Sequence, residues 1–173
     1  MSRAVVGVSW ARACSRPASI PVGKPRKKCK LAGLGYERDL AKALPAAKHG
    51  QWFEFRDRNG AGHCQTDLIL DCPLGLVVLE AKYTWTEQGH KQVEKLYQPV
   101  LGQAFPGRNI LGIVVCKVLT RETPRGWVCR DLDSAIKRAF VGAPTVLHWI
   151  GAGLGPLQGV SRVFPLAEAF AAL

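Results

Sequence analysis

The chain of 173 residues is long enough for one domain that buries a substantial core, and its hydrophobic content of 47% excludes wholesale disorder. No apolar run approaches the ~20 residues that a membrane helix needs, so we expect a soluble protein with no membrane partner. The net charge of +11 favours a polyanionic partner instead.

The positive charge is concentrated at the N-terminus. Residues 1–36 hold eight basic side chains and no acidic one, whereas the rest of the chain holds 16 basic and 13 acidic residues. We expect residues 1–30 to form a basic arm beside a single domain at 31–173, with DNA as the partner, because neutralising phosphates releases counterions. The side chains expected to contact phosphate are Lys24, Arg26, Lys27, Lys28 and Lys30. Targeting is the alternative, since an Arg-rich, acid-free segment is also typical of a mitochondrial transit peptide.

Helix and strand patterns follow the arm. A helix is expected over about Leu34–Leu44, where Pro45 stops it. The segment Trp52–Arg56 has the composition of a strand, and Arg58–Gly62 that of a hairpin turn. The chain therefore enters a sheet after its first helix.

Two further strands are expected after the hairpin turn, over Cys64–Asp71 and Gly75–Lys82. The second is almost continuously apolar, which suits a strand buried on both faces. A helix follows from about Thr86, with Pro99 expected to kink it or end it. The apolar stripe of that helix consists of Val93, Leu96, Tyr97, Val100 and Leu101.

The last third of the chain continues the alternation. We expect a strand over Ile110–Val118, a helix that Asp131 caps, and a strand over Thr145–Ile150. The order of helix, three strands, helix, strand, helix and strand predicts an α/β fold with a mixed central sheet flanked by helices. The six cysteines show no CxxC spacing, and a chain of this length needs no disulfides, so a reducing cytoplasm is favoured. We expect a cytoplasmic protein of the prokaryotic or phage type.

Charged residues end the apolar strand over Gly75–Lys82. Glu80 and Lys82 are two positions apart, so they share one face of the strand at a spacing of ~6–7 Å. Asp67 interrupts the preceding apolar run, and a hairpin can bring its carboxylate to that of Glu80. Together with the backbone carbonyl of Ala81, the two carboxylates make an oxygen-rich site suited to Mg²⁺ or Mn²⁺.

Two polar residues on the flanking helices are expected at the same site. Glu37 recurs with Leu40, Ala41 and Leu44 at the spacing of a core-facing helical stripe, so its carboxylate should point into a polar site. Gln92 flanks the apolar stripe of the second helix and could reach the site from the side.

This combination fits phosphodiester hydrolysis. Asp67 and Glu80 would hold a metal that shields the phosphate and lowers the pKa of a bound water. Lys82 would orient the attacking water or offset charge on the phosphorus, and Glu37 would act through a metal-bound water or a second metal. In the alternative without catalysis, Asp67 is an acidic residue of a turn, and Glu80 and Lys82 form only a salt bridge at the end of a strand. The joint occurrence of these residues in this order favours catalysis.

A family resemblance rests on the same residues. Asp67 followed by Glu80-Ala81-Lys82 resembles the motif of the PD-(D/E)xK nuclease superfamily, with Thr66 in place of the motif's proline. Gly35–Leu40 is similar to the first helix of archaeal-type Holliday junction resolvases, and Gln92–Leu96 is similar to the helix after their ExK strand.

The resemblance covers about residues 30–118 and implies an αβββαβ restriction-endonuclease-like core. It implies that the carboxylates of Glu37, Asp67 and Glu80 form the metal site, that Lys82 is catalytic, and that Arg38 contacts DNA. It also implies a homodimer, since a resolvase makes two symmetric nicks. The N-terminal arm and the last third of the chain depart from the pattern.

The leading expectation is therefore a Mg²⁺-dependent deoxyribonuclease that is selective for Holliday junctions or other branched DNA, in recombination or repair. A restriction-like or end-processing nuclease with the same site is one alternative. A module of the same fold that binds nucleic acid without cleaving it is another, although such a binder has no need of carboxylates that repel phosphate.

Overall fold

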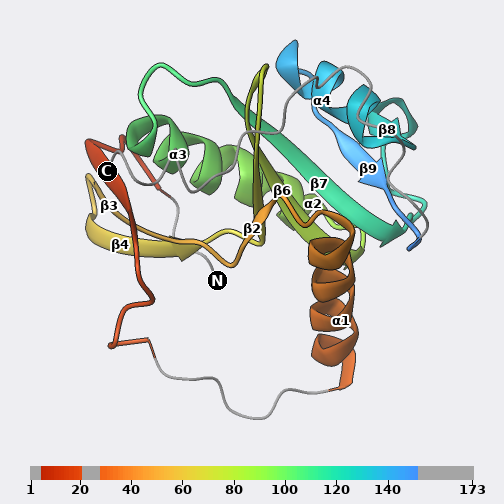
Figure 1. Cartoon of the computed structure of the whole chain (residues 1–173), viewed down its shortest axis with the longest axis horizontal. Coiled ribbons are helices and arrows are strands. Elements are labelled where there is room, and N and C mark those ends of the chain that lie inside the picture. Colours follow the sequence, from red (N-terminus) through yellow and green to blue (C-terminus); the bar gives the residue numbers. More distant parts are fainter. Residues whose placement is uncertain (1–4, 21–27, 152–173) are drawn as a thin grey trace.

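The structure, a computed structural model, describes residues 5–20 and 28–151, and over residues 28–30 it describes the backbone alone. Two sheets and the helices around them make up this part of the chain (Figure 1). The strands are β1 Trp10–Cys14, β2 Lys48–His49, β3 Trp52–Asp57, β4 Gly60–Gln65, β5 Leu68–Cys72, β6 Gly75–Thr84, β7 Ile110–Val118, β8 Val128–Cys129 and β9 Val146–His148. The helices are α1 Lys28–Ala43, α2 Glu87–Gln92, the π-helix η1 Val93–Tyr97, α3 Gln98–Ala104, the 3₁₀-helix η2 Arg125–Trp127 and α4 Leu132–Phe140.

The larger sheet has six strands in the order β2-β5-β6-β7-β9-β8. Strand β5 pairs antiparallel with both β2 and β6, whereas β6, β7, β9 and β8 run parallel to one another. The expected α/β fold, with a mixed central sheet flanked by helices, is therefore confirmed.

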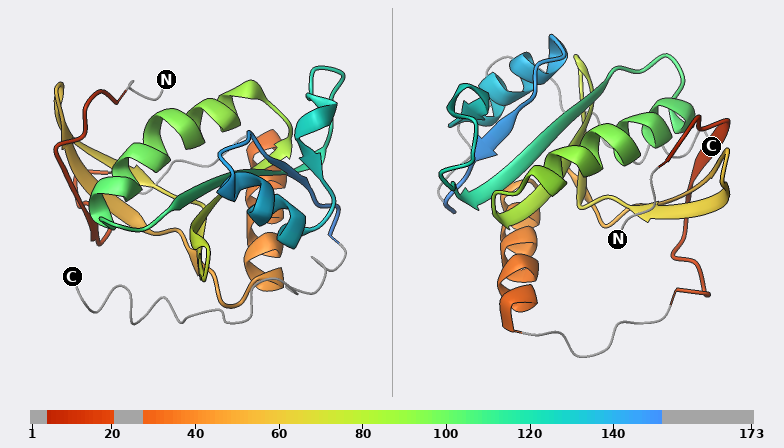
Figure 2. Two further views of the ribbon diagram at one scale, coloured as in Figure 1. Left: turned by 90° about the horizontal axis from the view of Figure 1, so that it is seen from above. Right: turned by 180° about the vertical axis from the view of Figure 1, so that it is seen from behind.

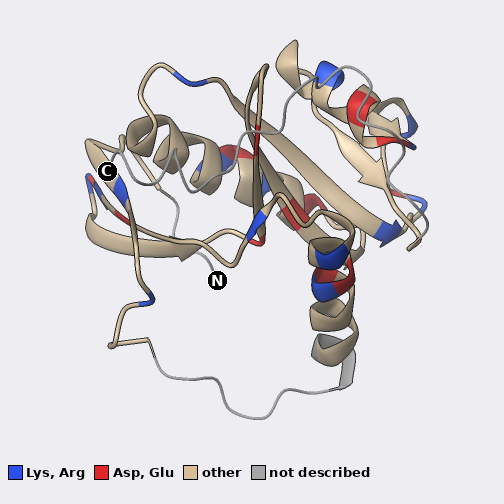
Figure 3. Ribbon diagram, viewed as in Figure 1, with Lys and Arg blue, Asp and Glu red and all other residues tan. Residues whose placement is uncertain are grey.

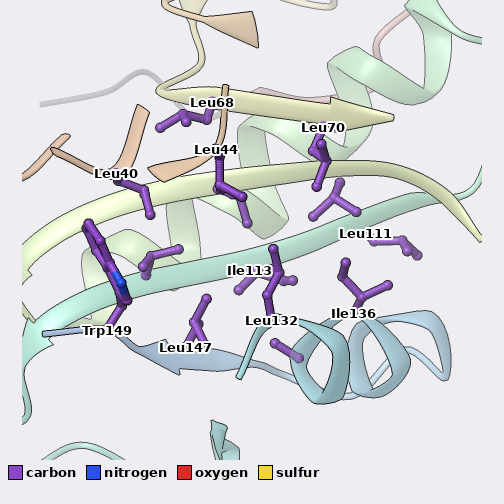
Figure 4. Close-up of a cluster of buried hydrophobic side chains, with 14 of the residues drawn as sticks. Leu40, Leu44, Leu68, Leu70, Leu111, Ile113, Leu132, Ile136, Leu147 and Trp149 are labelled. Atoms are coloured by element: carbon purple, nitrogen blue, oxygen red, sulfur yellow. The ribbon is translucent and has the colours of Figure 1, made fainter. Parts of the chain in front are cut away.

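Helices cover both faces of this sheet (Figure 2). On β6, Val77 and Leu79 face α1 and α4, while Leu76 and Val78 face η1 and α3. All four side chains are at most 1% exposed, which explains the continuous apolar run in the sequence. Figure 4 shows the cluster on the first face, where α1 and α4 contribute leucine and isoleucine side chains.

The second sheet contains β1, β3 and β4 and overturns one expected strand. A single strand over Cys64–Asp71 was predicted, and that prediction is wrong: β4 belongs to the three-stranded sheet and β5 to the six-stranded one. The chain bends at Thr66 and Asp67, where the Thr66 N–H donates to the Gln51 carbonyl 3.0 Å away. This bend places Asp67 at the junction of the two sheets.

The structure also differs from the expected arm over residues 1–30. Strand β1 pairs antiparallel with β3 along its whole length, and Ala11 is buried opposite Phe55. Alternation of exposed and buried side chains explains this pairing, because Trp10 and Arg12 face outward while Ala11 and Ala13 face inward. The basic cluster is not described: Lys24, Arg26 and Lys27 lie outside the described residues, as do the side chains of Lys28 and Lys30.

Two helices differ from their expected bounds. Helix α1 begins at Lys28, six residues before the expected start at Leu34. The helical path that begins at Glu87 does not end at Pro99, but changes to a π-helix over Val93–Tyr97 and continues as α3. Within this turn the Gln98 N–H donates to the Val93 carbonyl, five residues back. In the part of the chain that the structure describes, no helix is long and apolar enough to span a membrane.

Candidate active site

An open hollow of about 480 Å³ lies where α1, the β4–β5 bend, β6 and the α2–η1 helical segment meet. Its lining includes Glu37, Gln65, Asp67, Glu80, Ala81, Lys82, Gln92 and Tyr97. Every residue that the sequence suggested for the catalytic or metal site lines this one hollow. Arg38, by contrast, is exposed on α1 and does not line it.

Asp67 is fixed to β6 by its side chain. Its Oδ2 accepts a hydrogen bond of 2.8 Å from the N–H of Ala81, which lies between the two charged residues Glu80 and Lys82. Burial raises the pKa of the Asp67 carboxyl well above its ordinary range, and the negative charges of Glu80 and Glu37 raise that pKa further. The carboxylates of Asp67, Glu80 and Glu37 therefore lie close enough for the charge of one to affect the ionisation of another.

Glu80 is the most deeply buried of these acids, with 1% of its surface exposed. Its Oε1 accepts a hydrogen bond from the ammonium group of Lys82. Its Oε2 is buried and has no hydrogen-bond partner among the described residues. A buried carboxylate oxygen without a partner costs ~1–3 kcal/mol or more, so an additional positive group at this oxygen would be stabilising.

The alternation of β6 explains why Glu80 and Lys82 reach the hollow together. Glu80 and Lys82 lie on the same face of β6 as Leu76 and Val78, the face that η1 and α3 cover. The strand continues past the partner residues in β5, so its last residues are open to solvent and Lys82 is 27% exposed. Lys82 therefore lies between the buried Glu80 and water.

The π-helix brings a further residue into the site. The Tyr97 hydroxyl donates to the backbone carbonyl of Gln65 over 2.8 Å and accepts a hydrogen bond from the amide of Gln92. The carbonyl oxygen of the same Gln92 side chain lies 3.5 Å from the Lys82 ammonium. The residues Tyr97, Gln92 and Lys82 thus form one connected chain of polar contacts.

Glu37 lines the hollow, but its carboxylate contacts His49, which is not among the lining residues. Its Oε1 lies 2.6 Å from Nε2 of His49, the second residue of β2. Helix α1 carries Glu37 together with other charged residues, coloured red and blue in Figure 3, and it packs against β6. Glu37 is near enough to raise the pKa of Asp67 but is turned toward His49.

The donor set fits a hard divalent cation. Across residues 5–20 and 28–151, no three His, Cys, Asp or Glu side chains converge closely enough to hold a metal by themselves. Asp67 and Glu80 supply two carboxylates on neighbouring segments, and one oxygen of Glu80 is free to bind. Mg²⁺ and Mn²⁺ need few protein ligands of this kind, because waters complete their coordination.

Sequence reasoning missed three contributors, namely Tyr97, His49 and the Gln65 carbonyl. In the sequence Tyr97 is an apolar-stripe residue five positions after Gln92, and in an α-helix that spacing separates two side chains by about 140° around the axis. The π-helix makes this separation smaller. Apart from Pro99, no residue in the sequence indicated that Val93–Tyr97 would form a π-helix.

Comparisons with known proteins add nothing to this picture, since no family model, no curated protein and no solved structure matches the chain.

Proposed function

We propose that the chain is a metal-dependent nuclease that hydrolyses phosphodiester bonds of DNA, with Asp67, Glu80 and Lys82 at its centre. The observation that carries the proposal is the buried Glu80 carboxylate, which has one oxygen on Lys82 and the other without a described partner. Asp67 lies beside it with a raised pKa. This is an arrangement that gains stability when a cation binds.

The connectivity supports a restriction-endonuclease-like core. The elements α1, β2, β5, β6, α2–α3 and β7 follow one another in the order αβββαβ, with β3 and β4 inserted between β2 and β5. In the sheet the four strands are neighbours, with two antiparallel pairs and then one parallel pair. The PD-(D/E)xK motif residues would occupy the start of β5 and the end of β6.

Mg²⁺ or Mn²⁺ would be held by Asp67 and Glu80, with the backbone carbonyl of Ala81 as a further ligand. When bound, such an ion shields the phosphate charge and lowers the pKa of a coordinated water. Asp67 is positioned for this role by the Ala81 N–H. Glu37 would approach through water, since its carboxylate is held by His49.

Lys82 would act on the substrate side of the site. Its ammonium lies between Glu80 and Gln92 and is partly exposed, so it can contact a phosphate oxygen or the attacking water. A fixed positive charge at that place stabilises the charge that develops on phosphorus. Gln92, held by Tyr97, would keep the Lys82 side chain extended toward the substrate.

A binding module without turnover is the competing function. Its weakness is energetic, because a binder of phosphate gains nothing from a buried acid whose second oxygen lacks a described partner. A basic N-terminal cluster would serve either function. Branched DNA and a homodimer remain parts of the proposal that the resemblance alone supports.

The test is a cleavage panel of linear, single-stranded, nicked and four-way DNA, in Mg²⁺ and in EDTA. We expect cleavage in Mg²⁺ alone, and we expect Asp67→Asn and Glu80→Gln each to abolish it while DNA binding persists. The matched control is Asp39→Asn, an exposed acid two residues after Glu37 on α1, which should cleave as the wild type does. Full activity in Asp67→Asn or Glu80→Gln would overturn the assignment.

A further inference from the structure

We infer that the outer face of the β1–β3–β4 sheet binds a single-stranded segment of nucleic acid beside the catalytic hollow. The inference rests on the proposed function for the cleavage chemistry in the hollow. It adds the class of substrate, which is nucleic acid with unpaired bases next to the cut.

The outer face consists of side chains that point away from α3. By register, Trp10 lies opposite Arg56, Arg12 opposite Glu54, and Cys14 opposite Trp52. On the next strand, His63 lies opposite Glu54 and Gln65 opposite Trp52. The alternate residues Ala11, Phe53 and Phe55 point inward and are buried against α3. We call Trp10, Arg12, Trp52, Glu54, Arg56, His63 and Gln65 the outer face.

An exposed indole is the first sign of a ligand. Trp10 is 45% exposed, whereas Trp85 and Trp149 are each 5% exposed. The Arg12 guanidinium lies over the Trp10 ring, 5.3 Å from its centroid. Nucleic-acid bases stack on aromatic rings and on guanidinium planes alike, so a base can stack on the open part of the indole or on the guanidinium that lies over it.

The charge of the outer face suits phosphate. Glu54 is its one acidic residue, and that carboxylate accepts a hydrogen bond from the guanidinium of Arg12. Arg56 is exposed and forms no ion pair with the residues that the structure describes. Two arginines against one acid leave a positive surface, which attracts the backbone of a nucleic-acid strand.

The outer face is continuous with the hollow. Gln65 belongs to both. On the outer face it lies opposite Trp52, which in turn lies opposite Cys14, and in the hollow it is a lining residue together with Asp67, two residues further along the chain. The row of Trp10 lies four residues away along the strands, a distance of ~13 Å. A strand that stacks on Trp10 can therefore lead along the sheet to Asp67 and Glu80.

The geometry favours unpaired bases over a duplex. In a duplex the flat face of each base is covered by its neighbours, so an exposed indole has no surface on which to stack. A single strand presents those faces freely, and stacking on an aromatic side chain is tolerant of sequence.

The experiment compares the full chain with Trp10→Ala in EDTA, where no cleavage occurs. The probes are oligothymidine, oligouridine and a blunt duplex, and fluorescence anisotropy of the labelled probe measures binding. The wild type should prefer a single strand, and Trp10→Ala should weaken single-strand binding about tenfold. Trp10→Tyr should restore it. The two single-stranded probes show whether DNA or RNA is the ligand.

The matched control is Phe140→Ala, which removes a 47%-exposed aromatic from α4 in the other sheet's layer and should bind as the wild type does. Thermal unfolding of each variant separates lost contacts from lost fold. Single-strand affinity that is unchanged in a folded Trp10→Ala protein overturns the inference, as does a wild type that prefers the blunt duplex. Because binding is read without metal, the absence of cleavage in Mg²⁺ would overturn the proposed nuclease and leave this result standing.

Discussion

At the scale of single residues, Lys82 has the most clearly separable role. Its ammonium contacts Glu80 and Gln92 rather than Asp67. We therefore expect Lys82→Ala to leave metal affinity nearly intact and to lower turnover by ~10²-fold or more, as loss of a charge-stabilising group does. Single-turnover rates measured across a range of Mg²⁺ concentrations separate the two effects.

The control for Lys82 is Lys91→Ala, which removes an exposed ammonium paired with Glu87 on α2. That variant should keep the wild-type rate. An unchanged rate in Lys82→Ala would mean that Lys82 only neutralises Glu80 in the folded protein.

Asp67 gives a prediction about stability and pH. Burial, with the charges of Glu80 and Glu37, raises the pKa of Asp67 in the fold above its ordinary value of 3.8. Asp67 therefore binds a proton more tightly in the folded state than in the unfolded state. The stability of the metal-free protein consequently falls as the pH rises from about 3.8 through the raised pKa of Asp67. In EDTA at neutral pH, Asp67→Asn should unfold roughly 2–4 °C higher than the wild type, a gain of about 1 kcal/mol.

Calorimetry at several pH values measures this difference in unfolding temperature. The gap should close at acidic pH, where Asp67 is protonated in the folded and unfolded states alike. The exposed Asp39→Asn should show no gap at any pH. A lower unfolding temperature for Asp67→Asn at neutral pH would show that its charge is compensated in the metal-free fold.

At the scale of elements, the π-helix η1 sets the position of Tyr97. The Tyr97 hydroxyl joins Gln92 to the Gln65 carbonyl, so Tyr97→Phe leaves two polar groups without their partner. We expect a loss of about 1–2 kcal/mol in the free energy of unfolding. We also expect turnover to fall about tenfold, because Gln92 no longer holds Lys82, while metal affinity is kept.

Tyr83→Phe is the matched control, since Tyr83 lies next to Lys82 on β6 and is 40% exposed. It should keep both stability and rate. If Tyr97→Phe lost stability and kept its rate, the polar chain from Tyr97 to Lys82 would be structural only.

The elements that sequence reasoning predicted well are those with strong local patterns. The apolar run of β7 and the Asp131 cap of α4 lie where expected, and the Asp131 carboxylate accepts a hydrogen bond from the Ser134 N–H. The expected i,i+4 pair of Glu87 and Lys91 is also present. Such features depend on neighbours in the chain and need no tertiary information.

The features that could not be predicted depend on contacts distant in sequence. Cys64–Asp71 contains no Gly or Pro that would mark a break, and its pairing with two different sheets is what divides it at Thr66 and Asp67. Strand β1 is stabilised by pairing with β3, about forty residues later, and its five residues alone do not indicate that partner. The convergence of Asp67, Glu80 and Lys82 was anticipated from their spacing, whereas the Glu37–His49 contact depends on the placement of β2.

At the scale of the whole molecule, the N-terminal region has two separable parts. Residues 5–20 contribute a strand and the buried Ala11, so deleting residues 1–20 should expose β3 and the core around Phe53. We expect this deletion to lower the free energy of unfolding by more than ~2 kcal/mol. Denaturant titration measures the loss. An unchanged stability would show that β1 does not contribute to the stability of the domain and belongs to an arm.

The role of the basic cluster can be tested by removing its charge without shortening the chain. Replacing Lys24, Arg26 and Lys27 with glutamine keeps β1 and should leave stability unchanged. If these residues lie on phosphates, the plot of log affinity against log salt should flatten by about 0.9 for each lost contact on duplex DNA. An unchanged slope would favour targeting as the role of the cluster.

The central claim concerns the cation that Glu80 and Asp67 would hold. Its most direct test is a calorimetric titration of the metal-free protein with Mn²⁺, for the wild type, Glu80→Gln and the exposed control Glu87→Gln. The account predicts a saturable site in the wild type and in Glu87→Gln, and its loss in Glu80→Gln. Wild-type protein that binds no Mn²⁺, or Glu80→Gln protein that binds it as tightly as the wild type, would contradict the account.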